Sequence, residues 1–418
     1  MSSLVFCSEI ERVTHGWLRM LVFGFVVTAV AVVGRASDVR RPNLVVVIAD
    51  RFESPTSDAA SAGLPNQLNQ LDQLAAEGMR FDNYVVNTPD PSAALSTLLT
   101  GQYESTRQTS DSSAPAPNFE DSLGQLLTAK GYSCHIVATQ DSDLVEHFAP
   151  SFQRSDPSKS DESVQMPATD HERFTAATLA AEIQLEQLLG TRQPFALFVI
   201  YDSNAQVEAA GHVSADPNRH GKKSRTLNSI IDQQIGRLQN RLNEEADAGN
   251  TIFVVTALQG FAAESSTAHG QQRFREAYVR VPLVLRWPGK IPAGRRSNAC
   301  ISTVDLLPTF CGMLGVGYAD SVDGIDLSDS TRVDCSCEPD FAYLRSGPKS
   351  SQQPPTVWRA IRDQHWTYAR DLASGSEFLF HNATDPRQLM NLSDHPEHII
   401  DRSRLRQWLA EKRLVLQD

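Results

Sequence analysis

A hydroxyl-rich stretch and an aspartate at the end of an apolar run are the parts of this sequence that could carry chemistry. The stretch NTPDPSAALSTLLTG, from Asn87 to Gly101, contains hydroxyls but no cysteine, histidine, lysine or arginine. The run RPNLVVVIAD ends at Asp50. A hydroxyl attacks an ester only when a base or a metal activates it, and a carboxylate can hold such a metal. Hydrolysis therefore depends on whether suitable partners exist elsewhere in the chain.

The elements that would position these residues alternate between strand and helix. RPNLVVVIAD (41–50) is typical of a central parallel strand, whose carboxyl end is where α/β enzymes place functional groups. Apolar periodicity predicts further strands at 194–202, 251–257 and 279–289, a helix followed by a strand within 122–138, and helices at 66–78 and 174–190. A long amphipathic helix, LNSIIDQQIGRLQNRLNEE, precedes the strand at 251–257. The fold class is therefore α/β, a large and mostly parallel sheet flanked by helices.

Composition shifts predict how the chain is divided. The α/β domain is expected at 41–327 and a boundary rich in Ser, Asp and Pro at 328–352. A small C-terminal α+β subdomain is expected at 353–418, with antiparallel strands within 357–381 and a final helix at 397–415. Two polar stretches, 154–173 and 212–225, are predicted to be surface loops.

The N-terminus indicates export. Residues 20–33 form one uncharged apolar run, followed by GRAS, with small Gly34 and Ala36 before a cleavage point. This pattern predicts a signal peptide at 1–36, and Met20 is an alternative start. A membrane anchor is the competing reading, but the run is short for a bilayer span of about 20 residues. We expect export to the periplasm or the extracellular space, without a transmembrane anchor after cleavage.

Charge and cysteine content exclude several classes of partner. The net charge of −12 argues against nucleic acid and anionic membranes as partners. Six cysteines occur, and Cys7 would leave with the signal peptide, so the odd remainder argues against a complete disulfide framework. Cys335 and Cys337 form a lone C-x-C, which is a weak metal signal; pairing with each other or with Cys300 is the simpler reading. His220 and His269 are expected to be solvated loop residues.

Nine motifs, in order along the chain, resemble one family. They are RPNLVVVIAD, LDQLAAEGMRFDNYV, LLTGQY, AKGY, IDQQIGRL, NTIFVVT, RVPLVLRWPGKIPAG, STVDLLPTFCGMLGV with DGIDL, and WRAIRDQHWTYAR followed by LFHNATDPRQLMNL. From about residue 41 to the C-terminus, the chain resembles a sulfatase of the alkaline-phosphatase superfamily. No single motif is specific, but their order is.

This resemblance implies a fold and a chemistry. The fold is a large α/β domain with a small four-stranded antiparallel C-terminal domain. The chemistry is hydrolysis of sulfate esters by a formylglycine, made from Cys or Ser in a C/S-x-P-S-R motif. Calcium or magnesium is held by an Asp-Asp pair and an Asp-Asn or Asp-His pair, while lysine and histidine bind the sulfate and protonate the leaving group.

Transferred position by position, the family's active-site set is almost entirely replaced. One register puts Pro91 at the nucleophile and Leu95 at the arginine, and a two-residue insertion puts Pro89 and Ala93 there instead. The remaining replacements are Thr139 and Asp141 for a lysine and a histidine, Ala205 for a second histidine, Arg51 for the second aspartate, and Leu258 and Gln259 for the later metal pair. A later lysine falls near Gln271, with Arg273 and Arg275 close by. Of the polar set, only Asp50 is clearly retained.

These replacements disfavour a metal. Calcium takes about six to eight oxygen ligands, including several carboxylates. Arg51 adds a charge that would cost roughly 8 kcal/mol about 4 Å from a divalent ion at a dielectric of 20, unless it points away. We therefore expect no cofactor, or calcium or magnesium if the family site is partly retained. Asp50 could equally well cap backbone amides.

The opening stretch is better explained as the start of a helix. Asp90 is a good N-cap, and Pro91 suits the first helical position. The Asp90 carboxylate would then accept the hydrogen bonds of the backbone amides that bind sulfate in the family. Ser92, Ser96 and Thr97 carry hydroxyls, and superfamily relatives use such nucleophiles with zinc, but those enzymes need Asp/His clusters that are not found here.

Two functions remain open from the sequence. The first is an exported pseudo-sulfatase that binds an unknown ligand, a sugar or a protein. The second is an active sulfuric ester hydrolase with a rearranged site. The nucleophile and metal positions favour the first.

Overall fold

The large sheet is built around the predicted first strand. It has eight strands in the order β5-β4-β6-β1-β7-β8-β2-β9. All residues of the three central strands are buried, because helices cover both faces. The strands are β1 (Asn43–Ala49), β2 (Met79–Phe81), β4 (Ser133–Ala138), β5 (Gln153–Ser155), β6 (Phe195–Tyr201), β7 (Thr251–Ala257), β8 (Val284–Arg286) and β9 (Arg295–Ser297). The first five strands in this order, from β5 through β4, β6 and β1 to β7, run parallel to one another. Strand β8 is antiparallel to both of its neighbours, β7 and β2.

The computed structural model describes residues 40–52, 68–103, 121–139, 142–146, 152–155, 169–203, 217–260, 273–332, 338–346, 357–416 and 418. Within it, Pro42–Asp418 form one compact unit. The predicted signal peptide and its cleavage point lie outside the described residues. Among the described residues, no helix has the length and apolar character that a membrane span requires.

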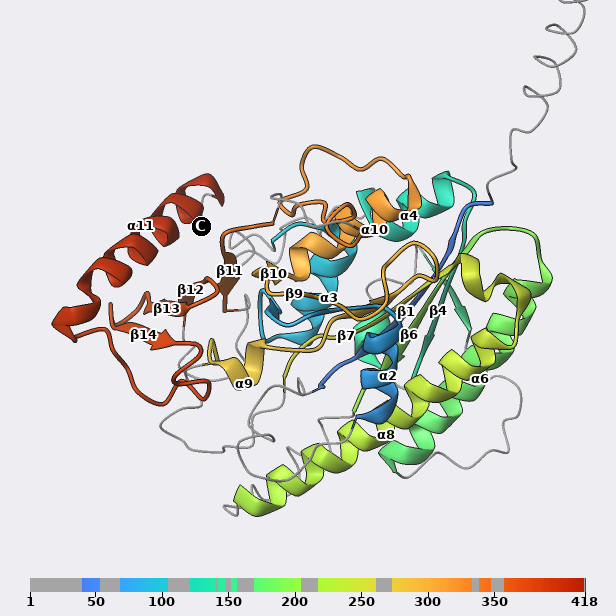
Figure 1. Cartoon of the computed structure of the whole chain (residues 1–418), viewed down its shortest axis with the longest axis horizontal. Coiled ribbons are helices and arrows are strands. Elements are labelled where there is room, and N and C mark those ends of the chain that lie inside the picture. The colour runs from blue at the N-terminus through green and yellow to red at the C-terminus, as the bar shows by residue number, and fades with distance from the viewer. Residues whose placement is uncertain are drawn as a thin grey trace, which may run out of the picture. The chain divides into compact units, whose positions relative to one another are not determined.

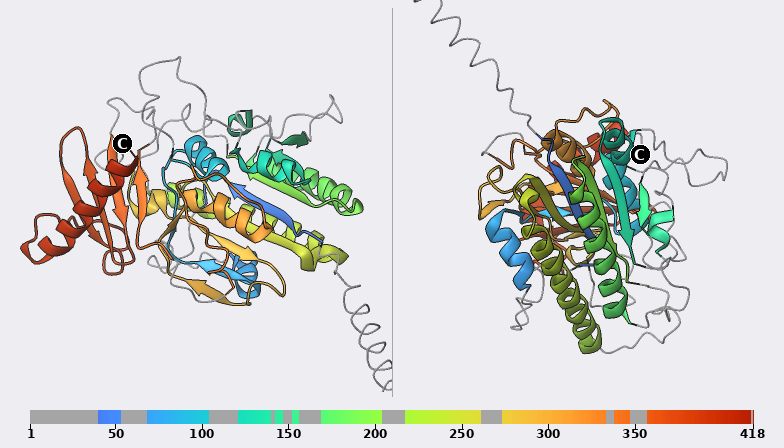
Figure 2. Two further views of the ribbon diagram at one scale, coloured as in Figure 1. Left: turned by 90° about the horizontal axis from the view of Figure 1, so that it is seen from above. Right: turned by 90° about the vertical axis from the view of Figure 1, so that its right-hand side faces the viewer.

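Two groups of helices cover the sheet (Figures 1 and 2). One group contains α2 (Asn69–Glu77), α6 (Asp170–Gly190) and α8 (Pro217–Asn243); α8 packs against both other helices, and α2 and α6 contact strands of the sheet. The other contains α3 (Pro91–Thr100), α4 (Leu123–Ala129) and α10 (Leu306–Leu314). Shorter elements are α5 (Asp143–Glu146), α9 (Glu276–Val279), the 3-10 helices η5 (Ala246–Asn250), η6 (Thr303–Asp305) and η7 (Pro396–His398), and the paired strands β3 (Tyr84–Val85) and β10 (Ile301–Ser302).

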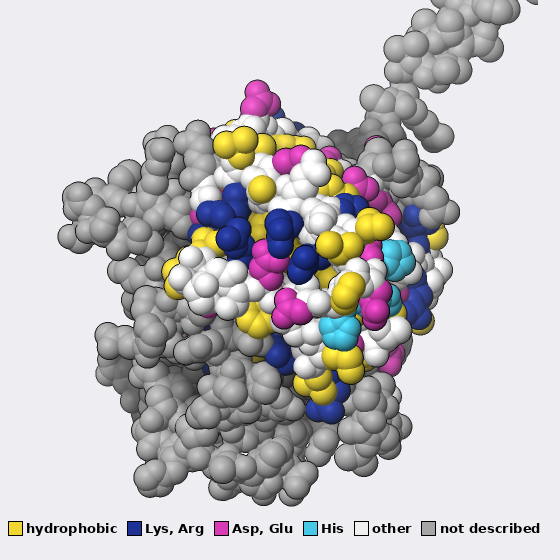
Figure 3. Space-filling view, turned by 90° about the vertical axis from the view of Figure 1, so that its left-hand side faces the viewer, with side chains coloured by type: hydrophobic (Ala, Val, Ile, Leu, Met, Phe, Trp, Pro, Cys, Tyr) yellow, Lys and Arg dark blue, Asp and Glu magenta, His cyan; other side chains and the backbone are white. Residues whose placement is uncertain are grey.

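A second sheet of four strands forms the C-terminal part. Its antiparallel order is β11 (Ala342–Arg345), β12 (Trp358–Arg362), β13 (Trp366–Asp371) and β14 (Glu377–His381). Helix α11 (Ile399–Leu416) packs on it through Leu405 and Leu409, which join one apolar cluster with side chains of the sheet. On the face that carries these elements, hydrophobic side chains are scattered among charged ones of both signs (Figure 3).

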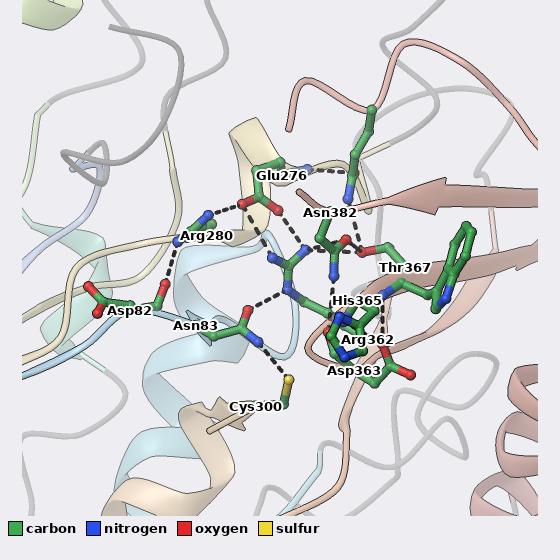
Figure 4. A network of polar contacts seen from close by, with 12 residues as sticks. Asp82, Asn83, Glu276, Arg280, Cys300, Arg362, Asp363, His365, Thr367 and Asn382 are labelled. Atoms are coloured by element: carbon green, nitrogen blue, oxygen red, sulfur yellow. Dashed lines mark hydrogen bonds and ion pairs between the residues drawn. The ribbon is translucent and has the colours of Figure 1, made fainter. Parts of the chain in front are cut away.

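A buried polar network joins the C-terminal sheet to the rest of the unit (Figure 4). Arg362 of β12 donates to Glu276 of α9, with Nη1 2.6 Å from Oε2 and Nη2 3.3 Å from Oε1. Arg280 Nη1 lies 2.5 Å from Glu276 Oε1, and Arg362 Nε donates to Asn83 Oδ1 at 2.9 Å. Asn83 Nδ2 in turn donates to Cys300 Sγ at 2.6 Å. The network therefore ties β12 of the C-terminal sheet to α9 and to the residues beside β3 and β10.

The predicted fold class is confirmed, and so are the antiparallel strands within 357–381 and the final helix. Both loop predictions were too long: α8 begins at Pro217, inside 212–225, and α6 begins at Asp170, inside 154–173. In the predicted strand at 279–289, only Val284–Arg286 is a strand. Strand β11 lies inside the segment 328–352, whose role as a domain boundary stays a prediction.

The cysteines of the described residues form no disulfide. Cys134, Cys300 and Cys311 are buried free thiols, so the pairing of Cys300 with the C-x-C cysteines is wrong in this structure. Cys335 and Cys337 themselves lie outside the described residues. His220 belongs to α8 rather than to a loop, and His269 lies outside the described residues.

Candidate functional site

The site positions gather at the carboxyl edge of the parallel strands. Asp50 follows β1, Ser203 lies two residues after β6, and Gln259 lies two residues after β7. Because β1 pairs in parallel with both β6 and β7, these three residues meet at one edge. The loop before α3 joins them there, since Gln259 reaches the Pro89 carbonyl.

Asp50 has a buried carboxyl group, and one of its two oxygens accepts a hydrogen bond. Its residue is 3% exposed, and its Oδ2 accepts a hydrogen bond from the Ser203 hydroxyl at 2.8 Å. Its Oδ1 is buried and has no hydrogen-bond partner among the described residues. Burial raises the pKa of Asp50 to about 7, with Asp202 adding to the rise and Arg51 opposing it. The group is therefore part protonated near neutral pH.

Arg51 lies between two positions at which the family resemblance implies metal ligands. Its Nε is 3.8 Å from Asp50 Oδ2. With the Gln259 amide oriented to satisfy both ends, its oxygen accepts from Arg51 Nε at 2.8 Å and its nitrogen donates to Pro89 O at 3.1 Å. In the opposite orientation, the oxygen accepts from Arg273 Nη2 at 3.3 Å. We favour the first orientation because both amide atoms are then paired. The Arg51 guanidinium therefore contacts the side chains of both Asp50 and Gln259.

A divalent cation does not fit this set of donors. Asp50 is the one carboxylate of the metal positions, Leu258 offers an apolar and fully buried side chain, and Gln259 is turned toward Pro89 and Arg51. Among the described residues, no cluster of three or more His, Cys, Asp or Glu could hold a metal ion. Calcium and magnesium both need more oxygen ligands than the described residues supply at this edge, and a guanidinium repels them.

The N-terminus of α3 is capped by its own aspartate, as predicted. Asp90 is the N-cap, its side chain accepts from the Ala93 amide at 3.1 Å, and Pro91 begins the helix. The Asp90 carbonyl accepts from the Ala94 amide at 2.8 Å. Proline contributes no N–H, so few amides at this helix end are left for an anion. Leu95, which one of the two registers puts at the arginine position, is 1% exposed and belongs to the core.

We expect Asp90→Ala to lower the free energy of unfolding by about 1 kcal/mol, because the Ala93 amide loses its cap. Asp90→Asn keeps an acceptor at the same place and removes the charge, so it is the matched control. Urea unfolding followed by circular dichroism measures both. Equal stability of the two variants would show that the cap contributes nothing.

The position predicted for the family's lysine is structural here. Thr139 is fully buried, its Oγ1 donates to the Asp202 carbonyl at 3.2 Å and accepts from the Asp202 amide at 3.0 Å. Ser142 Oγ donates to Asp202 Oδ2 at 2.7 Å. Asp141 and Ala205, the other two replaced positions, lie outside the described residues.

Three residues of this edge were not among the predicted site residues: Ser142, Asp202 and Ser203. Asp202 and Ser203 directly follow a buried strand, which is the signal that could have identified them. Arg273 was named for a shifted register. Burial lowers the pKa of Arg273, Asp90 opposes this, and Arg51 adds to it. Arg273 therefore belongs to the same charged group as Arg51.

Comparison with known proteins covers most of the chain. The sulfatase family model matches residues 42–316. The chain is 25% identical over 402 residues to an ulvan-active sulfatase of Formosa agariphila, covering 85% of this chain and 78% of that protein. It is 25% identical over 342 residues to the N-acetylgalactosamine-6-sulfatase of Sus scrofa, covering 68% of this chain and 65% of that protein.

Solved structures share the fold at lower identity. A 2-O GAG sulfatase superposes with a TM-score of 0.72 at 17% identity, covering 90% of this chain and 93% of that one. The phosphonate monoester hydrolase of Agrobacterium radiobacter superposes with a TM-score of 0.63 at 17% identity, covering 90% and 95%. The fold is therefore shared even with an enzyme named for another reaction. Because the family model matches about two-thirds of its length, this chain belongs to the sulfatase family.

Proposed function

We propose that this protein is a non-catalytic member of the sulfatase family with a binding or structural role. One observation carries the proposal: the Arg51 guanidinium lies 2.8 Å from Gln259 and 3.8 Å from Asp50, among the positions where the family resemblance implies a divalent cation. An internal cation at this place supports loss of the metal. Loss of the metal removes the Lewis acid on which sulfate transfer relies.

The nucleophile position supports the same proposal. Pro89 or Pro91 stands there, depending on the register, and proline can neither be oxidised to formylglycine nor attack sulfur. Thr139 replaces the lysine and is engaged with Asp202. The Asp90 carboxylate occupies the start of α3, where it would repel a sulfate.

The test is a sulfatase assay with aryl and sugar sulfates on the purified chain, combined with elemental analysis. We expect turnover at background and no stoichiometric calcium or magnesium. Pro91→Cys alone is expected to stay at background, because the metal positions are unchanged. About one calcium per chain, or turnover that Asp50→Ala abolishes, would overturn the proposal.

A rearranged hydrolase is the second candidate, and one contact favours it. The Ser203 hydroxyl donates to Asp50 Oδ2 at 2.8 Å, and Asp50 has a pKa of about 7, which suits a general base near neutral pH. Ser203 would be the nucleophile in such an enzyme. If ester hydrolysis is detected, Ser203→Ala decides between the two candidates, since a hydrolase of this kind would lose its turnover.

We also propose that the protein is exported and that its ligand is a sugar or a protein. The pattern at 1–36 supports a signal peptide cleaved after Ala36, which the mass of the mature N-terminus tests; a retained leader would contradict it. The named relatives act on ulvan and on N-acetylgalactosamine-6-sulfate. We therefore propose a sugar as the first ligand class to screen and a protein as the second.

A further inference from the structure

Two arginines occupy directly opposite positions on neighbouring strands of the C-terminal sheet. Arg345 of β11 pairs directly with Arg359 of β12 in the antiparallel register. Directly opposed like charges destabilise a sheet, and both residues are buried, at 3% and 2% exposure. Tyr343 lies two residues before Arg345 on the same strand and so shares its face. Two buried guanidinium groups this close need an anion beside them, and we therefore call Tyr343, Arg345 and Arg359 the anion cage.

Asp418 supplies that anion from beyond the end of α11. Arg359 grips its carboxylate with two bonds, Nε to Oδ2 at 2.6 Å and Nη2 to Oδ1 at 2.5 Å. The Tyr343 hydroxyl donates to Oδ2 at 2.5 Å, and Arg345 Nη1 lies 3.7 Å from the same atom. This two-pronged arginine contact is the geometry that recognises carboxylates and phosphates.

The anion cage is held in place by contacts that do not involve Asp418. Arg359 Nη1 donates to the Trp358 carbonyl at 2.9 Å and lies 3.5 Å from Ser346 Oγ. The Arg345 amide donates to the Asn87 carbonyl at 2.8 Å, and the Tyr343 ring packs edge-on against Tyr103 at 5.3 Å. The donors are therefore positioned by the strands and their neighbours, as in a preorganised site.

The tether of the bound carboxylate is short. Helix α11 ends at Leu416, and Asp418 is two residues further along. The fully buried apolar residues of α11 are Leu405 and Leu409, at least two turns before Asp418, and Trp408 and Leu416 pack against the same cluster. Removing the Asp418 side chain from the anion cage therefore leaves the packing of the helix in place.

We propose that the anion cage is an oxyanion-binding site, that Asp418 is its tethered ligand, and that a free carboxylate or sulfate takes the same place when Asp418 is withdrawn. A flat guanidinium fork, a hydroxyl and a second guanidinium match both groups. The site is separate from the edge that carries Asp50 and stands independently of the proposed function.

The test is anion rescue of Asp418→Ala in the full chain. Thermal unfolding is measured in sodium sulfate, sodium acetate and sodium chloride at equal ionic strength. We expect Asp418→Ala to lower the Tm in chloride, and sulfate and acetate to restore most of that loss. Sulfate raises the Tm of folded proteins in general, so the rise is compared with that of the wild-type chain and of Glu411→Ala, an exposed carboxylate on α11.

The double variant Asp418→Ala with Arg359→Met identifies the site. It is expected to lose the anion-specific rise, because the fork that grips the ligand is gone. A rise in Asp418→Ala no larger than in wild type, or a rise that survives in the double variant, would overturn the proposal. If Asp418→Ala does not fold in chloride, refolding from urea in sulfate, acetate and chloride decides the same question, and Asp418→Asn provides a milder second variant.

Discussion

Glu276→Ala is expected to lower the free energy of unfolding by about 3–5 kcal/mol, because it leaves buried charges without their partner. The Glu276 side chain is 6% exposed and contacts Arg362, which is 2% exposed, and Arg280, which is 16% exposed. Arg362 would keep its bonds to Asn83 and Thr367, but both of these partners are neutral. The loss should also loosen the attachment of the C-terminal sheet, since Glu276 lies on α9 and Arg362 on β12.

Urea unfolding followed by tryptophan fluorescence and circular dichroism measures this effect. Glu186→Ala is the control, because Glu186 is 71% exposed and lies 3.5 Å from Arg241. Exposed pairs contribute about 0–1 kcal/mol, so the control should stay near wild type. Similar losses in the two variants would mean that the buried network does not attach the C-terminal sheet to α9.

The stability of the protein is expected to fall as pH rises from about 4 to about 7, with Asp50 contributing roughly 4 kcal/mol. The pKa of Asp50 rises from 3.8 to about 7 on folding. Between these values the folded state keeps the proton and the unfolded chain releases it, so raising the pH favours unfolding. Above the folded pKa both states are ionised and this contribution changes no further.

Asp50→Asn isolates this contribution, because the pKa of Asp305 is also raised by burial, to about 6, and acts in the same direction. The stability of the variant relative to wild type should increase with pH across this range and then level off. Glu186→Gln removes an exposed carboxylate as a control. A difference between Asp50→Asn and wild type that does not change with pH would show that Asp50 ionises as readily in the folded chain as in the unfolded one.

The sequence predicted what depends on local patterns. The β-branched run at 41–50 gave the central strand, and Asp90 followed by Pro91 gave the start of α3. The start of α8 was missed because PNRHGKKSR lacks an apolar stripe. The sequence does place an aspartate and a proline at 216 and 217, and these residue types favour the N-cap and the first position of a helix. Local polarity was given more weight there than the helix-start signal.

The details of the site depend on strand order and register, which no local pattern contains. Ser203 meets Asp50 because β6 lies beside β1, and that order is set by packing of the whole sheet. The place of Asp50 at the end of the first strand was readable from the sequence, and the loss of metal ligands at Leu258 and Gln259 stays a prediction. The contact of Arg51 with Gln259, and the opposition of Arg345 and Arg359, required the structure.

The place of β1 in the sheet has a consequence for how the chain acquires its fold. Contacts of Asn43 in β1 reach Phe195 and Thr251, which lie 152 and 208 residues later. At a synthesis rate of about 5–20 residues per second, β1 would wait roughly 10–40 s for its second neighbour to be made. Closing such long loops also slows folding in free solution. A strongly apolar strand is thus made long before its partners, and we expect it to need shielding from aggregation in that interval.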